Sequence, residues 1–465
     1  MSGSVGIAAC GVAAPSWRVA ANDIRAAWGG KAKGTVAVCA PDEDPLTLAW
    51  SAAVAAMRSG GLDADAIGGL WWGTTRAPFA EGPSHAYLCA ALGLSSGVRG
   101  ALLSGSAHAG VDALLAAADA VVAGSVTTAL VVASDALVPG LGTAFEARCG
   151  AGSAAFILSA TGAAVVRASA THTAPVVDRY RGDREEATRD LYDARLFREE
   201  VFVPHVTEVA LMLDLPDDAR WSLPDPDGRL GAVVARRLGT SAVSSASAYE
   251  ILGDTGAAAP LLGLIPALAS TGPAGAVVYG GGRTTGVAFD VAAPIAGAGN
   301  LAVHGREVSY ADVLRARGQL VPSGETVEMG LPPGGAAFVR GNPEMMGLLG
   351  GRCVDCGVIS TPPSIHPHCV GCGGPKLEPV ELARQGTVHT YVVNHAMPAP
   401  FEAPLALAVI DLDDGARLMV QATDPEGIEI GALVELVLRR YAVERGVPVY
   451  GFKTRATKLS NDPTE

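Results

Sequence analysis

The stretch "SGSAHAGVDALLAAADAVVAG", from Ser104 to Gly124, joins a short glycine-containing turn to a long alanine-rich segment that ends in glycine. Glycine directly after a run of helix formers is a common helix-ending signal. The stretch therefore predicts a tight turn that leads into a buried helix. The residues at the turn are Ser106, Ala107 and His108.

The same pattern extends on both sides of this stretch, from residue 1 to about residue 290. Alanine-rich helical segments such as "PLTLAWSAAVAAMRSGG" alternate with continuous apolar runs of the kind found in buried strands. Three such runs lie at residues 128–137, 152–160 and 275–282. Alternating strands and helices predict a layered α/β domain.

Composition limits the possible classes of function. The chain has 465 residues, of which 49% are hydrophobic and 17% charged, and its net charge is −13. An acidic chain is a poor nucleic-acid binder, and an anionic ligand would need a local basic pocket. The longest uncharged run, between Asp254 and Arg283, contains three prolines. We therefore expect no membrane segment and, with no visible signal peptide, a cytoplasmic protein.

The pattern changes after residue 290. Residues 291–345 are less regular, with a helix expected at 309–321 and a linker at 322–338. From residue 379 to 465 short strands follow one another, and Asp414-Gly415 is a strong hairpin-turn signal. These features predict a small all-β barrel such as an OB-fold. Its strands lack a basic and aromatic surface, which disfavours a nucleic-acid role.

The segment "CVDCGVISTPPSIHPHCVGCGG" contains two C-x-x-C pairs separated by twelve residues. Four thiolates fill the tetrahedral coordination of Zn²⁺ and leave no open position, so the spacing predicts a structural, rubredoxin-like zinc ribbon at residues 346–378. Two alternatives remain: His366 or His368 as a ligand, and cysteines that are free or disulfide-bonded. The predicted zinc ligands are Cys353, Cys356, Cys369 and Cys372.

Several segments in order resemble a known family. Residues 1 to about 290 resemble hydroxymethylglutaryl-CoA synthases of the archaeal type, relatives of ketoacyl synthase III in the thiolase superfamily. The cysteine cluster and barrel resemble the zinc-ribbon/OB protein that accompanies such synthases. The resemblance implies a thiolase-like fold of two related halves at 1–290, a helical or linker segment at 291–345, a zinc ribbon at 346–378 and an OB-fold at 379–465. It also implies a homodimer. The supporting segments are "GIAACGVAAPSWRVAANDIRAAWG", "WGTTRAPFAEGPSHAYLCAALGL", "ARLFREEVFVPHV" and "LGDTGAAAPLLGLIPAL".

The resemblance exposes a missing nucleophile. The family carries a cysteine at the turn, which takes the acyl group from a thioester, and Ala107 occupies that position here. Other catalytic positions also depart from the family. Its glutamate falls on Thr75, and the asparagine of its Gly-Asn-Thr motif on Asp254. Its His-Gln-Pro-Asn-Gly-Lys stretch corresponds to "PDPDGR", which places Pro224, Asp227 and Arg229 on the histidine, asparagine and lysine; a shift of one residue places Asp225 on the histidine.

Several side chains are candidates for catalysis without that cysteine. We expect His108, Asp225, Asp227 and Asp254 near the pocket, where crowded carboxylates act as general acids or bases. The alternatives are a satisfied helix-start histidine, solvated loop aspartates and a helix cap at Asp254. Less favoured nucleophiles are a Ser106–His108 pair and the thiols of Cys89 and Cys149. The family's oxyanion hole is made of backbone, which corresponds here to Ala107 and the glycine loop with Gly281 and Gly282.

These observations leave two hypotheses. The first is an acyltransferase or condensing enzyme that binds acyl-CoA or a carrier-bound thioester and performs non-covalent acyl transfer or C–C bond formation or cleavage. The second is a catalytically silent thioester-binding or scaffold protein, which pairs with an active synthase or thiolase while the OB domain channels intermediates. The departures from the family pattern suggest secondary metabolism.

Overall fold

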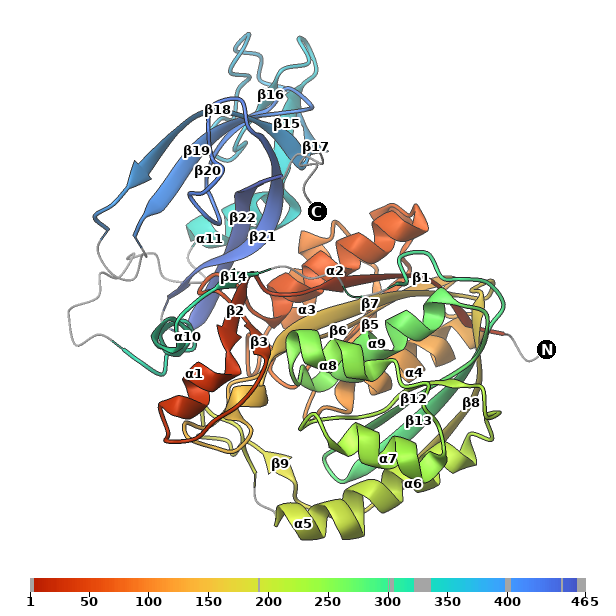
Figure 1. Cartoon of the computed structure of the whole chain (residues 1–465). Helices are drawn as coiled ribbons and strands as arrows, with labels where there is room; N and C mark the ends of the chain where they lie inside the picture. Colours follow the sequence, from red (N-terminus) through yellow and green to blue (C-terminus); the bar gives the residue numbers. More distant parts are fainter. Residues whose placement is uncertain are drawn as a thin grey trace. The chain divides into compact units, whose positions relative to one another are not determined.

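The computed structural model describes residues 4–190, 193–299, 301, 305–321, 336–397, 403–444 and 446–457. They form two compact units, Met1–Val321 and Pro322–Glu465, which are described separately (Figure 1). Residues 291–321, which the sequence sets apart from the α/β domain, belong to the first unit.

The first unit contains a nine-stranded sheet with the order β11-β12-β13-β8-β1-β7-β6-β4-β5. Strand β1 pairs with β8 through two residue pairs, so the sheet consists of a five-stranded and a four-stranded half. The apolar runs expected to be strands correspond to β6, β7 and β12. The bounds are β1 Gly6–Ala13, β4 Gly69–Gly73, β5 Arg99–Leu103, β6 Thr128–Ala136, β7 Ala151–Ser159, β8 Ala164–Thr173, β11 Arg220–Ser222, β12 Gly272–Gly280 and β13 Arg283–Val291.

Helices cover both faces of each half-sheet. Successive side chains of a strand point to opposite faces. Val131 of β6 and Val278 of β12 share one hydrophobic cluster with α4 (Ala109–Val122) and α9 (Ala259–Leu264), which form the middle layer. Val277 of β12 instead joins a cluster with α6 (Val203–Met212). Helix α2 (Pro45–Gly60) packs on β1, β6 and β7 from the face that Gly11 presents. The result is five alternating layers, α/β/α/β/α (Figure 1), which confirms the predicted layered fold.

Smaller elements complete the first unit. Residues 306–307 form β14, which extends a three-stranded sheet with β2 and β3 and explains why this segment belongs to the α/β unit. The remaining bounds are β2 Trp17–Ala20, β3 Thr35–Val38, β9 Arg179–Tyr180, β10 Arg189–Asp190, β14 Arg306–Glu307, α1 Ala21–Ala26, α3 Ser84–Ala91, α5 Ala194–Leu196, a π-helical turn Phe197–Phe202, α7 Leu230–Leu238, α8 Ser245–Leu252, a 3₁₀ turn η4 Gly256–Ala258, a second 3₁₀ turn η5 Ile265–Ala269 and α10 Tyr310–Ala316.

The second unit combines a small ribbon with a barrel. The ribbon has the strand order β16-β15-β17, and the barrel has the order β20-β19-β18-β21-β22. An isolated bridge between Ala422 and Thr454 brings the two barrel edges together, so the barrel is nearly closed and the predicted OB-fold is confirmed. The bounds are α11 Ala336–Gly347, β15 Leu349–Cys353, β16 Ile359–Ser360, β17 Leu377–Glu381, β18 Gln385–Asn394, β19 Leu405–Leu412, β20 Arg417–Gln421, β21 Leu433–Glu444 and β22 Val447–Ala456.

Two sequence expectations concern segments near the unit boundary and in the barrel. The expected linker at 322–338 lies mostly outside the described residues, and its last residues, 336–338, begin α11 instead. The expected turn at Asp414-Gly415 is present, with Gly415 at φ +88°. In the described ranges, none of the helices has the length and apolar character that a membrane span requires.

Candidate functional site

A cavity of about 280 Å³ lies in the first unit at the carboxyl ends of β4 and β5. These two strands and β6 run parallel, so the loops that follow β4 and β5 meet at one edge of the sheet. Helix α8, the turn η4 and the end of β12 supply other walls. The predicted site residues among those that line it are Ala107, Asp225, Asp254 and Gly281.

Glycines hold the turn at Ala107 in place. A Cβ on Gly280 would lie 3.1 Å from the backbone nitrogen of Ala107, so the glycine loop reaches the turn. A Cβ on Gly73 would lie 2.3 Å from the carbonyl oxygen of Ala109, and one on Gly110 would lie 2.1 Å from that of Ala257. Helix α4 therefore starts directly against β4 and the η4 turn, with Ala107 at its positive end.

The side chains of Ser106 and His108 make local contacts at the turn and in the first turn of α4. The Ser106 hydroxyl oxygen accepts a hydrogen bond from the backbone N–H of His108 at 3.2 Å. His108 is 2% exposed, and its Nδ1 lies 3.0 Å from Oδ2 of Asp112, which also accepts a hydrogen bond from Arg283. His108 is not among the described residues that line the cavity, whereas Ser106 is.

Asp227 and Gly282 also lie outside the described lining. Asp227 accepts hydrogen bonds from the backbone N–H groups of Arg229 and Leu230, both at 2.9 Å, at the start of α7. Gly282 has φ +72°, and a Cβ there would meet the carbonyl oxygen of Ala174 at 2.2 Å. Both residues therefore have local structural roles next to the cavity.

Asp225 is the half-buried carboxylic acid of the cavity. Its Oδ1 atom is shielded from solvent and has no hydrogen-bond partner in the described structure. Burial, with a further contribution from the negative charge of Asp227, raises the pKa of Asp225 to about 6. A carboxyl with this pKa exchanges protons near neutral pH, which suits a general acid or base.

Asp254 is paired with an arginine that the sequence did not single out. Nη1 of Arg179 donates to Oδ2 of Asp254 at 2.5 Å, and Oδ1 of Asp254 accepts the backbone N–H of Gly256 at 3.0 Å. Arg179 also contacts Asp190 at 3.3 Å and stacks on Phe145 with its Cζ atom 4.7 Å from the ring centroid. Burial alone would lower the pKa of Arg179, but Asp254 and other negative neighbours outweigh it and raise the pKa. The negative charge of Asp254 is therefore neutralised by Arg179.

Asp178, a second lining residue that sequence reasoning missed, faces the glycine loop. Burial raises the pKa of Asp178, and hydrogen bonds from backbone N–H groups, including that of Gly281, oppose the rise. The Gly281 amide predicted to polarise a substrate carbonyl is thus also a donor to this carboxylate. A buried carboxylate at Asp254 needs a positive partner, and this need is the signal that would have identified Arg179. A backbone amide that donates to Asp178 leaves no pattern in the sequence.

Asp135, at the end of β6, connects segments next to the cavity through hydrogen bonds. Its carboxylate accepts hydrogen bonds from Thr74, from the backbone and hydroxyl of Thr75, and from the backbone N–H of Ala257. Burial nevertheless raises the pKa of Asp135 to about 6. Thr75, which the resemblance places at the family's glutamate, is therefore held by this buried acid.

The raised pKa of Asp135 makes stability depend on pH. The folded protein holds the proton more tightly than the unfolded chain, so this contribution to stability is complete below about pH 4 and is lost as pH rises through 6. Because an asparagine at this position cannot titrate, we expect the stability advantage of wild type over Asp135→Asn to shrink by roughly 3 kcal/mol between pH 4 and pH 7. Urea unfolding of both proteins across this range measures the change. A constant difference would contradict the assignment.

The two thiols considered as replacement nucleophiles are poorly suited to that role. Burial raises the pKa of Cys89 to about 11 and that of Cys149 to about 12, so both stay protonated at neutral pH. Neither is among the described residues that line the cavity.

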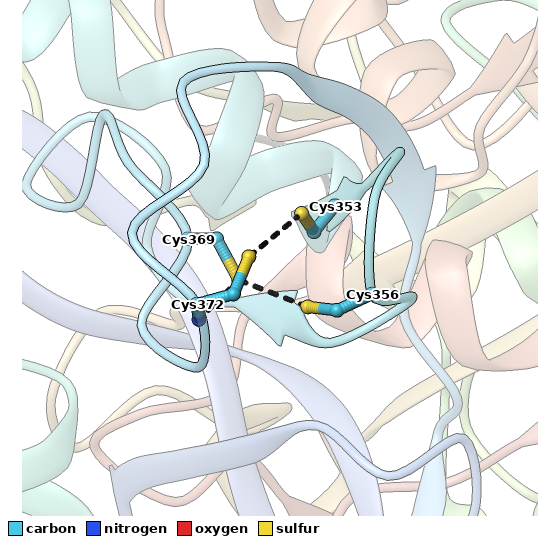
Figure 2. A group of neighbouring side chains, drawn as sticks. All are labelled: Cys353, Cys356, Cys369 and Cys372. Atoms are coloured by element: carbon cyan, nitrogen blue, oxygen red, sulfur yellow. Dashed lines mark hydrogen bonds between the residues drawn. The ribbon is translucent and has the colours of Figure 1, made fainter.

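The four ribbon cysteines form a separate site in the second unit (Figure 2). Their sulfur atoms all lie within 4.8 Å of one another, with 3.7 Å between Cys353 and Cys372 and 3.4 Å between Cys356 and Cys369. Disulfide sulfurs would lie about 2 Å apart. A tetrahedral Zn²⁺ with Zn–S bonds of about 2.3 Å places its ligand sulfurs about 3.8 Å apart. The cluster therefore has the size to bind a metal ion.

The surroundings of the cluster also favour metal binding. The sulfur of Cys369 accepts hydrogen bonds from the backbone N–H groups of Cys372 and Gly371, at 3.5 Å and 3.3 Å, and such donors stabilise a thiolate ligand. His366 and His368 are exposed and are not part of the described cluster.

The two units are similar to different known proteins. A family model described as "ChsH2, C-terminal OB-fold domain" matches residues 379–439. A "DUF35 domain-containing scaffold protein" of Methanocaldococcus jannaschii is 40% identical over 113 residues, which cover 23% of this chain and 79% of that protein. A hydroxymethylglutaryl-CoA synthase of Caldivirga maquilingensis is 26% identical over 292 residues, 59% of this chain and 83% of that enzyme.

A solved structure supports the fold of the first unit. The structure titled "MvaS in complex with 3-hydroxy-3-methylglutaryl coenzyme A" has a TM-score of 0.59 and 20% identity, and the match covers 71% of this chain and 96% of that one. Together with the layer order, this match confirms the thiolase-like fold that the sequence resemblance implied. Through its second unit the chain belongs to the family of DUF35 domain-containing scaffold proteins, and this unit is joined to a hydroxymethylglutaryl-CoA synthase-like first unit.

Proposed function

We propose that the first unit binds an acyl thioester, carried by coenzyme A or a carrier protein, and acts on it without an acyl-cysteine intermediate. The observation that carries this proposal is the cavity itself, in which Ala107 stands at the start of α4 and Asp225 supplies a carboxyl of raised pKa. The titles of similar structures name 3-hydroxy-3-methylglutaryl coenzyme A for MvaS and an acetyl donor-ACP for the curacin pathway HMG synthase. Both ligands are thioesters of the proposed class.

The proposed chemistry is direct acyl transfer or C–C bond formation or cleavage. In the transfer reaction an acceptor atom bonds to the thioester carbonyl carbon, the C–S bond breaks, and Asp225 carries the acceptor's proton to the departing sulfur. Backbone N–H groups at Ala107 and Gly281, which line the cavity, stabilise the charge that develops on the carbonyl oxygen, with the substrate replacing Asp178 at Gly281.

Three other polar residues would support this chemistry rather than carry it. Asp254, neutralised by Arg179, offers a fixed polar wall to the substrate. His108 and Asp227 act through their neighbours, by orienting the starts of α4 and α7.

Replacement of Asp225 by asparagine tests this role. We expect Asp225→Asn to lower the turnover rate by about 100-fold, because general acid–base catalysis commonly contributes a factor of 10² to 10⁴. The wild-type rate should change with an inflection near pH 6, rising with pH if Asp225 accepts a proton and falling if it donates one, and the variant should lose this inflection. Asp217→Asn, in an exposed loop, is the matched control. Equal rates and equal pH profiles would remove Asp225 from the mechanism.

A second candidate function is favoured by the scaffold proteins similar to the second unit. In that case the first unit is a silent thioester-binding partner of an active synthase or thiolase, and the barrel channels intermediates. Incubation with acyl-CoAs and acceptors, followed by mass spectrometry, separates the two. Product without a protein adduct supports the enzyme, whereas thioester binding without turnover supports the scaffold. An acyl group attached covalently to a side chain of the cavity would contradict both candidate functions, since neither includes an acyl–protein adduct.

We also propose a homodimer and a zinc ion. Strand β5 is an edge strand whose residues Arg99, Gly100 and Ala101 are exposed, and such an edge readily pairs with a second chain. In the ribbon, the four sulfurs would hold Zn²⁺ as a structural ion, because they occupy every tetrahedral position. Reduced cysteines of this kind fit a cytoplasmic protein.

A further inference from the structure

Three arginines line the cavity, although the chain as a whole carries a net charge of −13. Arg76 follows β4 and Arg181 follows β9, and both line the cavity with Ala107. Arg179, the third arginine of the lining, is neutralised by Asp254 and Asp190. Arg76 and Arg181 therefore carry the positive charge that remains among these arginines.

Neither of these two arginines has a buried carboxylate as its direct partner in the described structure. Arg76 donates to the backbone carbonyl of Glu186 at 2.6 Å and contacts the Glu186 carboxylate at 3.3 Å, but that side chain is 97% exposed, whereas Arg76 is 25% exposed. Exposed ion pairs contribute little because water screens them. Arg181 donates to the backbone carbonyl of Glu185 at 3.2 Å. Neither contact is a fixed, buried counter-charge.

Charges of both signs lie near Arg76. Burial lowers the pKa of Arg76, and the positive charges of Arg181 and Arg317 lower it further, against the opposing charges of Glu186 and Asp135. Nη1 of Arg317 is itself shielded from solvent without a hydrogen-bond partner in the described structure. An anion placed between Arg76 and Arg181 would relieve this repulsion and accept hydrogen bonds from both guanidinium groups.

We propose that Arg76 and Arg181 form a subsite for a carboxylate on the acyl group or acceptor, next to the reacting thioester. The two loops that follow the parallel strands β4 and β5 place Arg76 and Ala107 in the same cavity, so the anion would lie near the reaction centre. The phosphates of coenzyme A share the chemistry of a carboxylate, but the pantetheine arm separates them from the thioester. The subsite deepens the proposed function and rests on it for the rest of the substrate.

Free succinate tests the subsite without a thioester. We expect succinate to raise the melting temperature of the wild-type full-length protein and to have no effect on Arg76→Gln/Arg181→Gln. Arg195→Gln, on the exposed helix α5, is the matched control and should behave as wild type. Arg76→Lys/Arg181→Lys keeps the charges and should recover part of the shift. If succinate stabilises the Gln/Gln variant as much as wild type, the subsite is wrong.

Paired thioesters identify the source of the anion. We expect calorimetry to show that wild type binds succinyl-CoA about tenfold more tightly than valeryl-CoA, a preference that the Gln/Gln variant loses while its affinity for free coenzyme A stays within about twofold. An equal loss for free coenzyme A would overturn the carboxylate assignment in favour of a phosphate. Thioester binding that ignores both arginines sinks the subsite and leaves the proposed function standing. Arginine-dependent succinate binding without any thioester binding would support the subsite and contradict the proposed function.

Discussion

Arg179→Met is expected to lower the free energy of unfolding by about 3 kcal/mol, because it leaves a buried carboxylate without its counter-charge. Asp254 is buried, and its Oδ2 lies 2.5 Å from Nη1 of Arg179. Asp190, which contacts the same guanidinium, would lose its partner as well. Urea unfolding followed by tryptophan fluorescence measures the loss.

A second substitution separates charge from packing. Asp254→Asn in the Arg179→Met background removes the stranded charge and should recover more than half of the lost stability, although Asp254→Asn alone is expected to destabilise wild type. Arg167→Met is the control, since Arg167 pairs with Asp290 where both side chains are at least half exposed, and it should cost less than about 1 kcal/mol. The ion-pair account fails if the double variant is no more stable than Arg179→Met.

Loss of the ribbon metal is expected to have the largest effect on the second unit. Structural zinc contributes about 10–16 kcal/mol of binding free energy in small zinc domains. Purified protein should contain one zinc per chain, and Cys356→Ser or a strong chelator should remove it. Limited proteolysis of the full-length protein should then cut within residues 346–378, because the cysteine loops lose their cross-link.

The control for the zinc prediction is a cysteine outside the cluster. Cys89→Ala should keep the full metal content, since Cys89 lies in α3 of the first unit. Metal content is read by atomic emission spectrometry, and proteolysis by mass spectrometry. Full-length protein that contains no zinc but resists proteolysis at the ribbon would show that the cysteines stabilise the fold without a metal.

Local patterns predicted much of this fold. The continuous apolar run at 128–137 became β6 because a strand buried on both faces has no polar side, and the C-x-x-C spacing brought four sulfurs together because each pair needs a single local turn. The family resemblance predicted the thiolase-like fold, and the prediction that Ala107 stands at the family's cysteine position rests on the same resemblance. These features depend on residues close in sequence or on a complete set of motifs in order.

The charged residues of the cavity and their partners were harder to predict from the sequence. Arg179 pairs with Asp254, 75 residues away, and no periodicity connects them. The sequence predicted His108 and Asp227 near the pocket, but the His108 ring faces Asp112 within α4 and Asp227 accepts backbone N–H groups at the start of α7. A one-residue shift of the family stretch places Asp225 on the histidine, whereas its position in the cavity and its raised pKa depend on the tertiary structure.

The glycine contacts of Gly73, Gly110 and Gly280 bear on the substitutions that position 107 tolerates. They fix the course of the main chain around position 107 by backbone contact, so this course does not depend on which side chain stands at that position. Exchange between a methyl group and a thiol at position 107 would therefore leave the backbone of the turn in place. The chemistry at position 107 is thus separable from the course of its backbone, whereas a side chain at any of the three glycines would crowd a neighbouring backbone.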